Sequence, residues 1–410
     1  MSNFPPNWQI MKIGQFAKRV KRKNHNHISD NVLTISANDG LISQKEFFNK
    51  IVASKDTSGY TLLENGEFAY NKSYSEGFPV GAARRLRKYS DGIVSPLYIC
   101  FCINQEILDL KYADYLFNSQ WFISAIYSIA KEGARSHGLL NIGINEFFDA
   151  SLPIPTLPEQ MKISKILYKI DQLLEKTRNQ ILKLQYLHKG LVSQFLSVGI
   201  NDGISNETNV DFIPNGWCIK KIEEVSTFRR GSFPQPYGRA EWYDDNGYPF
   251  VQVYDIDENY KLKSTTKARI SKLAAKKSVF IPKGSLIVSI QGSIGRVAIT
   301  QYDAYVDRTI LIFKNFENHF DKRFLSILIK ELFLQQGQIA DGGIIKTITK
   351  QTLSEFKVKQ PPLIEQKKIA EIILTVASNI ELKKRKLHQI QKTKQSLIQD
   401  LLSGRKRMNI

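Results

Sequence analysis

Two stretches of the chain place apolar residues at intervals of seven, a spacing typical of long helices that pack along one stripe. In the first stretch this series consists of Ile163, Ile170, Thr177, Leu184 and Leu191. The second stretch repeats it with Ile369, Val376, Ile390 and Leu397. Neither stretch contains proline after its first turn. Each is predicted to form one helix of about 39 residues, roughly 58 Å long.

The two helical stretches are copies of each other. PTLPEQMKISKIL, from Pro155, recurs without a gap as PPLIEQKKIAEII, from Pro361, and a tryptophan (Trp8, Trp217) opens the part before each copy. A repeat this long does not fit a solenoid and predicts a duplicated module of one globular unit and one helix. An antiparallel coiled coil with a pseudo-two-fold internal repeat is the simplest packing, and two unrelated core helices are the alternative.

The globular parts, residues 8–152 and 217–357, carry the patterns of mixed α/β (α+β) domains. Strands are predicted at Gly92–Ile103, Pro249–Tyr254, Val279–Pro282, Gly284–Ile290, Arg296–Thr300 and Thr309–Phe313. Helices are predicted at Lys111–Ala130 and Lys322–Gln336, and the polar stretch Gly199–Thr208 predicts a linker. The expected organisation is a first α/β domain at 1–152, a central helix at 153–200, a linker and second α/β domain at 201–357, and a C-terminal helix at 358–410.

The charge balance indicates a polyanionic partner. Of 410 residues, 58 are Lys or Arg and 39 are Asp or Glu, which gives a formal net charge of +19. An excess of this size favours nucleic acid first and an anionic membrane surface second. Residues 358–410 hold 12 Lys or Arg against 4 Asp or Glu, which a solvated helix face and tail would also show.

Cysteine use and apolar runs bear on the compartment. Cys100, Cys102 and Cys218 are too few for a disulfide framework, and we expect them to be small buried residues in a reducing cytoplasm. The longest apolar runs, Leu97–Ile103 and Leu286–Ile290, have the length of strands, so no membrane span is expected. The first residues lack the apolar stretch of a signal peptide. The prediction is a cytoplasmic protein that does not contact a membrane.

Basic residues cluster in loops of both globular parts that also contain Gly, Asn, Gln and Tyr. Such loops offer donors to phosphates and to base edges in the major groove. The candidate DNA-binding residues of the first part are Lys21, Arg22, Asn71, Lys72, Tyr74, Arg84, Arg85, Arg87 and Lys88. Those of the second part are Arg229, Arg230, Gln235, Tyr237, Arg239, Gln291 and Arg296. A solvated surface explains any single cluster equally well, but clusters in both parts favour DNA.

Sequence motifs for catalysis are missing. There is no Asn-Pro-Pro-Tyr or Asp-Pro-Pro-Tyr tetrapeptide of an adenine methyltransferase, and Gly292–Gly295 lacks the lysine and spacing of a phosphate loop. His25 and His27 have no ordered set of acidic partners that would make a metal or nuclease site. We therefore predict neither catalytic nor metal-binding residues.

The order of these features resembles the specificity (S) subunit of type I restriction–modification systems. Each globular part opens with a Pro-Asn-(Gly)-Trp segment and is followed by a P-x-L-x-E-Q-x-x-I helix. GEFAYNKSYSEGFPVGA (Gly66–Ala82), SPLYICF (Ser95–Phe101) and GSLIVSIQGSIGRVAI (Gly284–Ile299) are also typical of that family's recognition domains. Trp8 departs from the pattern because it lacks the glycine that precedes Trp217.

The resemblance implies a DNA-recognition subunit without catalysis of its own. Each globular part would be a target recognition domain for one half of a bipartite site in double-stranded DNA. The paired helices would set the spacer and dock two methyltransferase (M) subunits, with Glu159, Gln160, Glu365 and Gln366 as expected partner-binding positions. Restriction (R) subunits would join in the full complex. Adenine-N6 methylation and ATP-dependent cleavage would then belong to M and R, so AdoMet, ATP and Mg²⁺ are expected on those subunits and none on this chain.

Two other classes of protein remain open at this point. A self-contained enzyme, for instance a nuclease with an unrecognised motif, would methylate or cut DNA alone. A coiled-coil adaptor would bind protein through its helices, and its basic loops would bind DNA without sequence preference or not at all.

Overall fold

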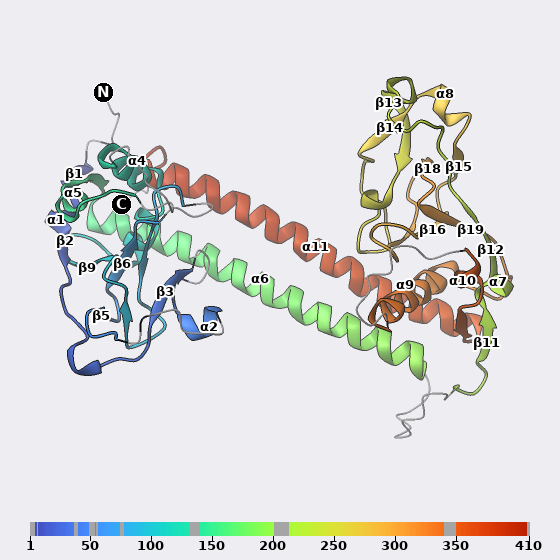
Figure 1. Cartoon of the computed structure of the whole chain (residues 1–410), viewed down its shortest axis with the longest axis horizontal. Coiled ribbons are helices and arrows are strands. Elements are labelled where there is room, and N and C mark those ends of the chain that lie inside the picture. The colour runs from blue at the N-terminus through green and yellow to red at the C-terminus, as the bar shows by residue number, and fades with distance from the viewer. Residues whose placement is uncertain are drawn as a thin grey trace. The chain divides into compact units, whose positions relative to one another are not determined.

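The computed structural model describes residues 5, 7–36, 40–48, 54, 56–73, 78–130, 140–200, 213–339 and 350–407. The chain forms two compact units, one made of Met1–Lys176 with Leu387–Ile410 and the other of Thr177–Lys386. Each unit therefore combines one globular domain with parts of both long helices. Figure 1 follows the elements along the chain.

A four-stranded antiparallel sheet forms the centre of the first domain, in the order β2–β9–β6–β7. Its strands are β2 (Ala17–Arg19), β6 (Phe68–Asn71), β7 (Ala82–Arg85) and β9 (Ile99–Ile103). The remaining strands form the pairs β1 (Gln9–Lys12) with β10 (Ser151–Ile154), β3 (Leu33–Ser36) with β4 (Gly40–Ser43), and β5 (Thr61–Glu64) with β8 (Asp91–Val94).

Aromatic side chains fill the core of this domain. Phe68, Tyr70, Phe101, Phe122 and Phe147 are all fully buried, and the rings of Phe68 and Phe101 stack with centroids 5.3 Å apart. The short helices of the domain are α1 (Ile13–Phe16), α2 (Gln44–Phe48), α3 (Leu110–Leu116), α4 (Gln120–Ile129) and α5 (Ile144–Asp149), with a 3₁₀ turn at His25–His27.

The second domain contains two four-stranded sheets. One has the order β12–β19–β16–β17 and consists of Ser226–Arg230, Ile310–Phe316, Leu286–Ser289 and Val297–Ile299. The other has the order β14–β13–β18–β15 and consists of Ala268–Ile270, Tyr243–Val251, Ala304–Val306 and Val279–Ile281. The antiparallel pair β11 (Cys218–Lys221) with β20 (Lys357–Gln360) corresponds to β1 with β10.

Helices of the second domain are α7 (Ile222–Val225), α8 (Lys272–Ala275), α9 (Lys322–Ile339) and α10 (Lys350–Ser354), and its 3₁₀ turns are η2 (Ala240–Trp242) and η3 (Val253–Asp255). In both domains the last strand leads within a few residues into a long helix. These helices are α6 (Leu157–Ser197) and α11 (Leu363–Leu402), shown in green and red in Figure 1.

The long helices pack in opposite directions. In the first unit, Ile163 and Leu167 near the start of α6 share a core with Leu401 and Leu402 at the end of α11. In the second unit, Val192 and Phe195 near the end of α6 share a core with Ile369 and Ile373 near the start of α11. The apolar stripe that the heptad spacing predicts is thus buried where each helix meets a domain, at Ile163 and Ile369, and half-buried elsewhere, as at Ile170 and Leu184.

The predicted fold class is confirmed: the chain has two α/β domains and two long helices, in a repeated order. The compact units differ from the predicted domains in one respect. Each long helix is shared between the two units, whereas the prediction gave each helix a segment of its own. Most of the predicted linker, residues 201–208, lies outside the described residues.

Several local predictions are wrong. The strand predicted at Gly92–Ile103 is divided into β8 and β9, and the helix predicted at Lys111–Ala130 is divided into α3 and α4. All three cysteines were expected to be buried, but only Cys100 is. Cys218 is exposed because β11 pairs along one edge only, and Cys102 is partly exposed because it lies near the end of β9. The strand predicted at Pro249–Tyr254 ends at Val251, and η3 begins two residues later, at Val253. The backbone N–H of Gln252 donates to Asp255 Oδ2 at 2.9 Å, a turn contact that stops the strand.

Among the described residues, no helix has both the length and the apolar character that a membrane span requires.

Candidate nucleic-acid interface

The Glu-Gln pair at the start of α6 joins the first domain to the helix. The indole N–H of Trp8 donates to Glu159 Oε2 at 3.1 Å, and Arg407 donates to both oxygens of this carboxylate, at 2.9 and 3.2 Å. Gln160 accepts from the backbone N–H of Asp109 at 2.8 Å, and its amide donates to the carbonyls of Ile107 and Pro155 at 3.0 and 2.9 Å. Both side chains are fully buried.

The second unit repeats this joint at the start of α11. The indole N–H of Trp217 donates to Glu365 Oε2 at 3.1 Å, and the backbone N–H of Ile200 donates to Glu365 Oε1 at 2.9 Å. Gln366 accepts from the backbone N–H of Asp321 at 2.7 Å and donates to the carbonyls of His319 and Pro361 at 2.9 and 2.7 Å. The two joints therefore use the same side chains for the same kinds of contact.

A left-handed glycine completes each joint where a long helix ends. Gly199 has φ +81°, and a β-carbon there would lie 3.0 Å from the Trp217 ring and 2.4 Å from the Glu365 carboxylate. Gly404 has φ +73°, and its β-carbon would lie 2.4 Å from Pro5 and 3.5 Å from the Trp8 ring. Only glycine fits both the backbone conformation and the close approach.

The burial of these residues argues against a partner-binding role, which stays a prediction. Glu159, Gln160 and Gln366 have no exposed surface, and Glu365 is bonded to the same unit by two hydrogen bonds. A buried polar side chain with internal partners is not available to a second protein, and its loss leaves other buried groups unpaired. The structure assigns all four residues to holding domain and helix together.

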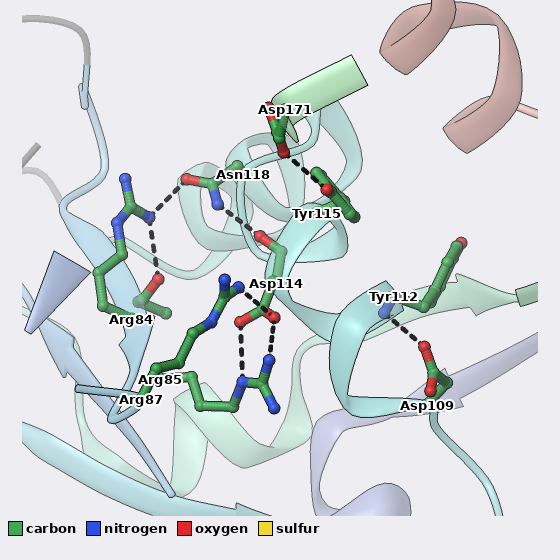
Figure 2. A network of polar contacts seen from close by, with 10 residues as sticks. Arg84, Arg85, Arg87, Asp109, Tyr112, Asp114, Tyr115, Asn118 and Asp171 are labelled. Atoms are coloured by element: carbon green, nitrogen blue, oxygen red, sulfur yellow. Dashed lines mark hydrogen bonds and ion pairs between the residues drawn. The ribbon is translucent and has the colours of Figure 1, made fainter. Parts of the chain in front are cut away.

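The predicted basic cluster of the first domain is built around an acidic residue that the sequence analysis missed. Arg85 donates through Nε and Nη2 to the two oxygens of Asp114, at 3.2 and 2.6 Å, and Arg87 forms an ion pair with the same carboxylate. Figure 2 shows the two guanidinium groups meeting at Asp114, which lies on α3. Burial raises the pKa of the Asp114 carboxyl, and the charges of Arg87 and Arg85 oppose this rise.

Neighbouring residues of this cluster also have partners. Arg84 donates to Asn118 Oδ1 at 2.6 Å and lies over the Phe78 ring, 4.8 Å from its centroid. Lys88 forms an ion pair with Glu46 on α2. The cluster is thus an ordered network of basic side chains with their counter-charges, and not a row of independent solvated cations.

The other candidates of the first domain fall at two ends of the sheet. Arg22 pairs with Glu67 at 2.6 Å, at the end of the sheet from which Arg85 and Arg87 continue, and Lys21 is exposed beside it. Asn71 lies at the opposite end, where it donates to the Tyr98 hydroxyl at 3.3 Å, and Lys72 donates to the carbonyl of Ile142 at 3.2 Å. Tyr74 lies outside the described residues.

In the second domain the candidates gather at one end of a sheet. Arg229 and Arg230 are exposed at the end of β12, and the backbone N–H of the next residue, Gly231, donates to the carbonyl of Ile310. Ile310 pairs with Ser289 of β16, and the turn that contains Gln291 follows directly. The loop at 231–239 and the turn at 291–295 therefore leave the sheet at the same end.

The individual side chains of these two loops differ in availability. Gln235 is exposed, Arg239 pairs with Glu241 at 3.1 Å, and Arg308 lies over the Tyr237 ring. Arg296 donates to the carbonyl of Ile256 at 3.0 Å, so part of its hydrogen-bonding capacity is used within the domain. Arg229 and Arg230 are consequently the most available cations of this group.

Comparison with known proteins agrees with this architecture. Residues 214–392 match the family model described as the type I restriction modification DNA specificity domain. The MjaVIII type I restriction enzyme specificity subunit of Methanocaldococcus jannaschii is 24% identical, over 98% of this chain and 94% of the relative. The MjaX specificity subunit of the same organism is also 24% identical, but the match covers 63% of this chain and only 59% of that relative.

Solved structures match over the whole length. The type I restriction–modification S subunit from M. genitalium superposes with a TM-score of 0.58 at 13% identity, over 100% of this chain and 98% of that one. A chain from a structure of the assembly and conformational transition of a type I R-M system gives 0.55 at 17% identity, over 98% of each chain.

The chain has the fold of the type I specificity subunits. By sequence, residues 214–392 are similar to the type I restriction modification DNA specificity domain. The family resemblance inferred from the repeated helices is therefore confirmed.

The joints give a direct test of this structural role. Replacing Gln160 by Ala removes three buried hydrogen bonds, and we expect the free energy of unfolding of the first unit to fall by about 1–3 kcal/mol. Gln366→Ala should do the same to the second unit. Calorimetric melting of each variant measures the change, with the exposed Gln395→Ala as the matched control. If a variant melts at the wild-type temperature but binds a partner subunit less tightly, the residue contacts the partner, as the sequence predicted.

Proposed function

We propose that this chain is the DNA-recognition subunit of a type I restriction–modification complex and has no catalytic activity of its own. The observation that carries the proposal is the duplicated frame: the same helix joint supports two domains whose sheets and basic loops differ. A repeated support with different loops suits a protein that presents two different binding surfaces in one defined arrangement.

Each domain would recognise one half of a bipartite site in double-stranded DNA. Arginine and glutamine side chains in loops are the groups that pair with guanine and adenine edges in the major groove. The exposed Arg229, Arg230 and Gln235 of the second domain offer such groups. Half-sites contacted on one face of a duplex have centres about one helical turn, roughly 34 Å, apart.

The paired helices would set the spacer and dock two M subunits. Since Glu159, Gln160 and Gln366 are buried and Glu365 is bonded within its own unit, docking must use the outward faces of α6 and α11. These faces carry large exposed apolar side chains: Met161 at 56%, Tyr186 at 76%, Ile364 at 73% and Leu382 at 58%. A subunit that packs on these faces would remove this apolar surface from water.

Methylation, ATP use and cleavage would belong to M and R subunits, which act with this chain in the cytoplasm. AdoMet, ATP and Mg²⁺ would accordingly be bound by those subunits, a division that the missing AdoMet and phosphate-loop motifs support. The DNA specificity domain and the whole-length fold match favour this function over the adaptor and the nuclease.

If each domain recognises its own half-site, a change in one domain should affect one half-site only. Replacing Arg229 and Arg230 by Gln should relax or weaken the second half-site alone, by about 1–3 kcal/mol for each lost bidentate base contact. Single-molecule sequencing of methylated bases in cells that carry the variant measures this. The matched control is Lys283→Gln, which removes an exposed charge just before β16, at the other end of that strand from the turn that contains Gln291. Equal loss at both half-sites would contradict separate recognition domains.

A change in helix length tests the spacer role. Inserting one heptad into α6 and one into α11 at matching positions preserves the apolar stripe and adds about 10 Å. We expect both half-sites to be kept and the spacer to grow by about 3 base pairs, since base pairs rise 3.4 Å each. Inserting seven residues into the linker at 201–208 is the control and should leave the spacer unchanged. An unchanged spacer in the helix variant would refute the role.

A further inference from the structure

The Arg-rich network of the first unit opens into a pocket of about 390 Å³. All of its lining residues belong to that unit. The charged ones are Arg84, Arg85, Arg87, Lys88, Lys394, Asp114 and Asp171. Five cations thus face two carboxylates, and Lys88 also pairs with Glu46 outside the lining. The pocket keeps a net positive charge after every ion pair is counted.

A chain of polar contacts ties this pocket to both long helices. The hydroxyl of Tyr115, on α3, donates to Asp171 Oδ2 on α6 at 2.7 Å, as Figure 2 shows. Asp171 Oδ1 forms an ion pair with Lys394 of α11 at 2.5 Å. Next to Tyr115, Asp114 holds Arg85 and Arg87. The positions of the basic groups are therefore fixed by three helices as well as by the sheet.

The second unit shows that the fold does not require this network. Asp109 and Asp321 occupy equivalent places, since each donates its backbone N–H to the glutamine of its joint and caps the helix that follows. Counting six residues on from these caps, Ile327 takes the place of Tyr115. In the long helices, where the copies align without a gap, Ala377 takes the place of Asp171.

Both of these counterparts are buried and apolar, with Ile327 1% and Ala377 4% exposed. Tyr115 and Asp171 thus have apolar counterparts in the second unit, whereas Asp114 and Lys394 correspond to the uncharged Ser326 and to His188. Ion pairs of either kind add little stability over apolar packing, because solvent screens the partly exposed ones and taking the buried ones out of water offsets their attraction. The network of the first unit calls for a role other than holding the fold.

We propose that this pocket binds a phosphate group and that Asp114 is the positioning residue that aims Arg85 and Arg87 at it. A guanidinium has five N–H donors in one plane, and the contacts with Asp114 use only some of them. The side chains of Arg87 and Lys88 remain 55% and 57% exposed, so they can meet a ligand. Arginine forks match phosphate oxygens in pairs, which makes phosphate the anion that the pocket fits best.

The phosphate could come from the DNA backbone or from a free phosphate compound. Binding of backbone phosphate rests on the proposed function. Arg85 and Arg87 would then fix the position of the first domain along the duplex without reading bases. The second source is independent of that function. The two are separated by using different probes on the full-length chain.

Pyrophosphate titration tests the pocket itself. Isothermal calorimetry of inorganic pyrophosphate should show binding to the full-length chain that Arg87→Gln weakens about tenfold, as expected for a lost charge-assisted pair. The matched control is Lys165→Gln, which removes one exposed charge from α6 in the same unit and should change affinity less than about twofold.

Asp114→Asn tests positioning by the sign of its effect. Removing a negative charge from a basic pocket strengthens anion binding if charge alone matters. If Asp114 aims the guanidinium groups, pyrophosphate affinity falls about fivefold despite the added positive charge, and Asp114→Glu recovers part of it. Thermal melting confirms that the variants are folded. An increase in affinity for Asp114→Asn would overturn the positioning role.

Binding to a 30-base-pair duplex of mixed sequence identifies the source. If the ligand is backbone phosphate, Arg87→Gln should reduce the slope of log affinity against log salt by about 0.9, and Lys165→Gln should not. An unchanged slope with impaired pyrophosphate binding would assign the pocket to a free phosphate compound. If Arg87→Gln alters neither measurement, the phosphate site is refuted. The proposed function would be refuted separately, by the lack of a bipartite methylation motif.

Discussion

The Glu-Gln pair at the start of each long helix is the contact on which the rest of the structure depends. It joins the backbone before α3 or α9, the tryptophan that opens the domain and the first turn of the helix. Each pair also contacts the segment that leaves the other long helix, through Arg407 in one unit and Ile200 in the other. Because buried polar groups must be paired, these few contacts fix where each domain meets its helices.

The joints leave the domains free to diverge. Among the described residues, the first domain has one four-stranded sheet with three strand pairs, whereas the second has two four-stranded sheets and one pair. At positions equivalent within the repeat, one unit carries Tyr115 and Asp171 and the other carries Ile327 and Ala377. The supporting contacts are thus conserved between the copies while the surfaces above them differ, which is the property that recognition of two unlike half-sites requires.

The sequence predicted the large features because they depend on periodicity and repetition. The heptad spacing defined both long helices to within a few residues, and the ungapped repeat at Pro155 and Pro361 showed the duplication. The candidate site was predicted less well. Asp114 is an isolated carboxylate 29 residues from Arg85 in the chain, and only the packing of α3 against β7 brings the two together. The buried role of Glu159 was missed for the same reason, although a tryptophan and a glutamate recurring in both copies would have suggested the pairing.

The central claim is that the chain gives a methyltransferase complex its DNA sequence specificity. Mapping methyladenine across the host genome, with the gene intact, deleted and restored on a plasmid, tests this claim most directly. We expect a bipartite motif methylated in both halves that disappears on deletion and returns with the plasmid. An unchanged set of methylated motifs in the deletion strain, in cells that express the M subunit, would contradict the account.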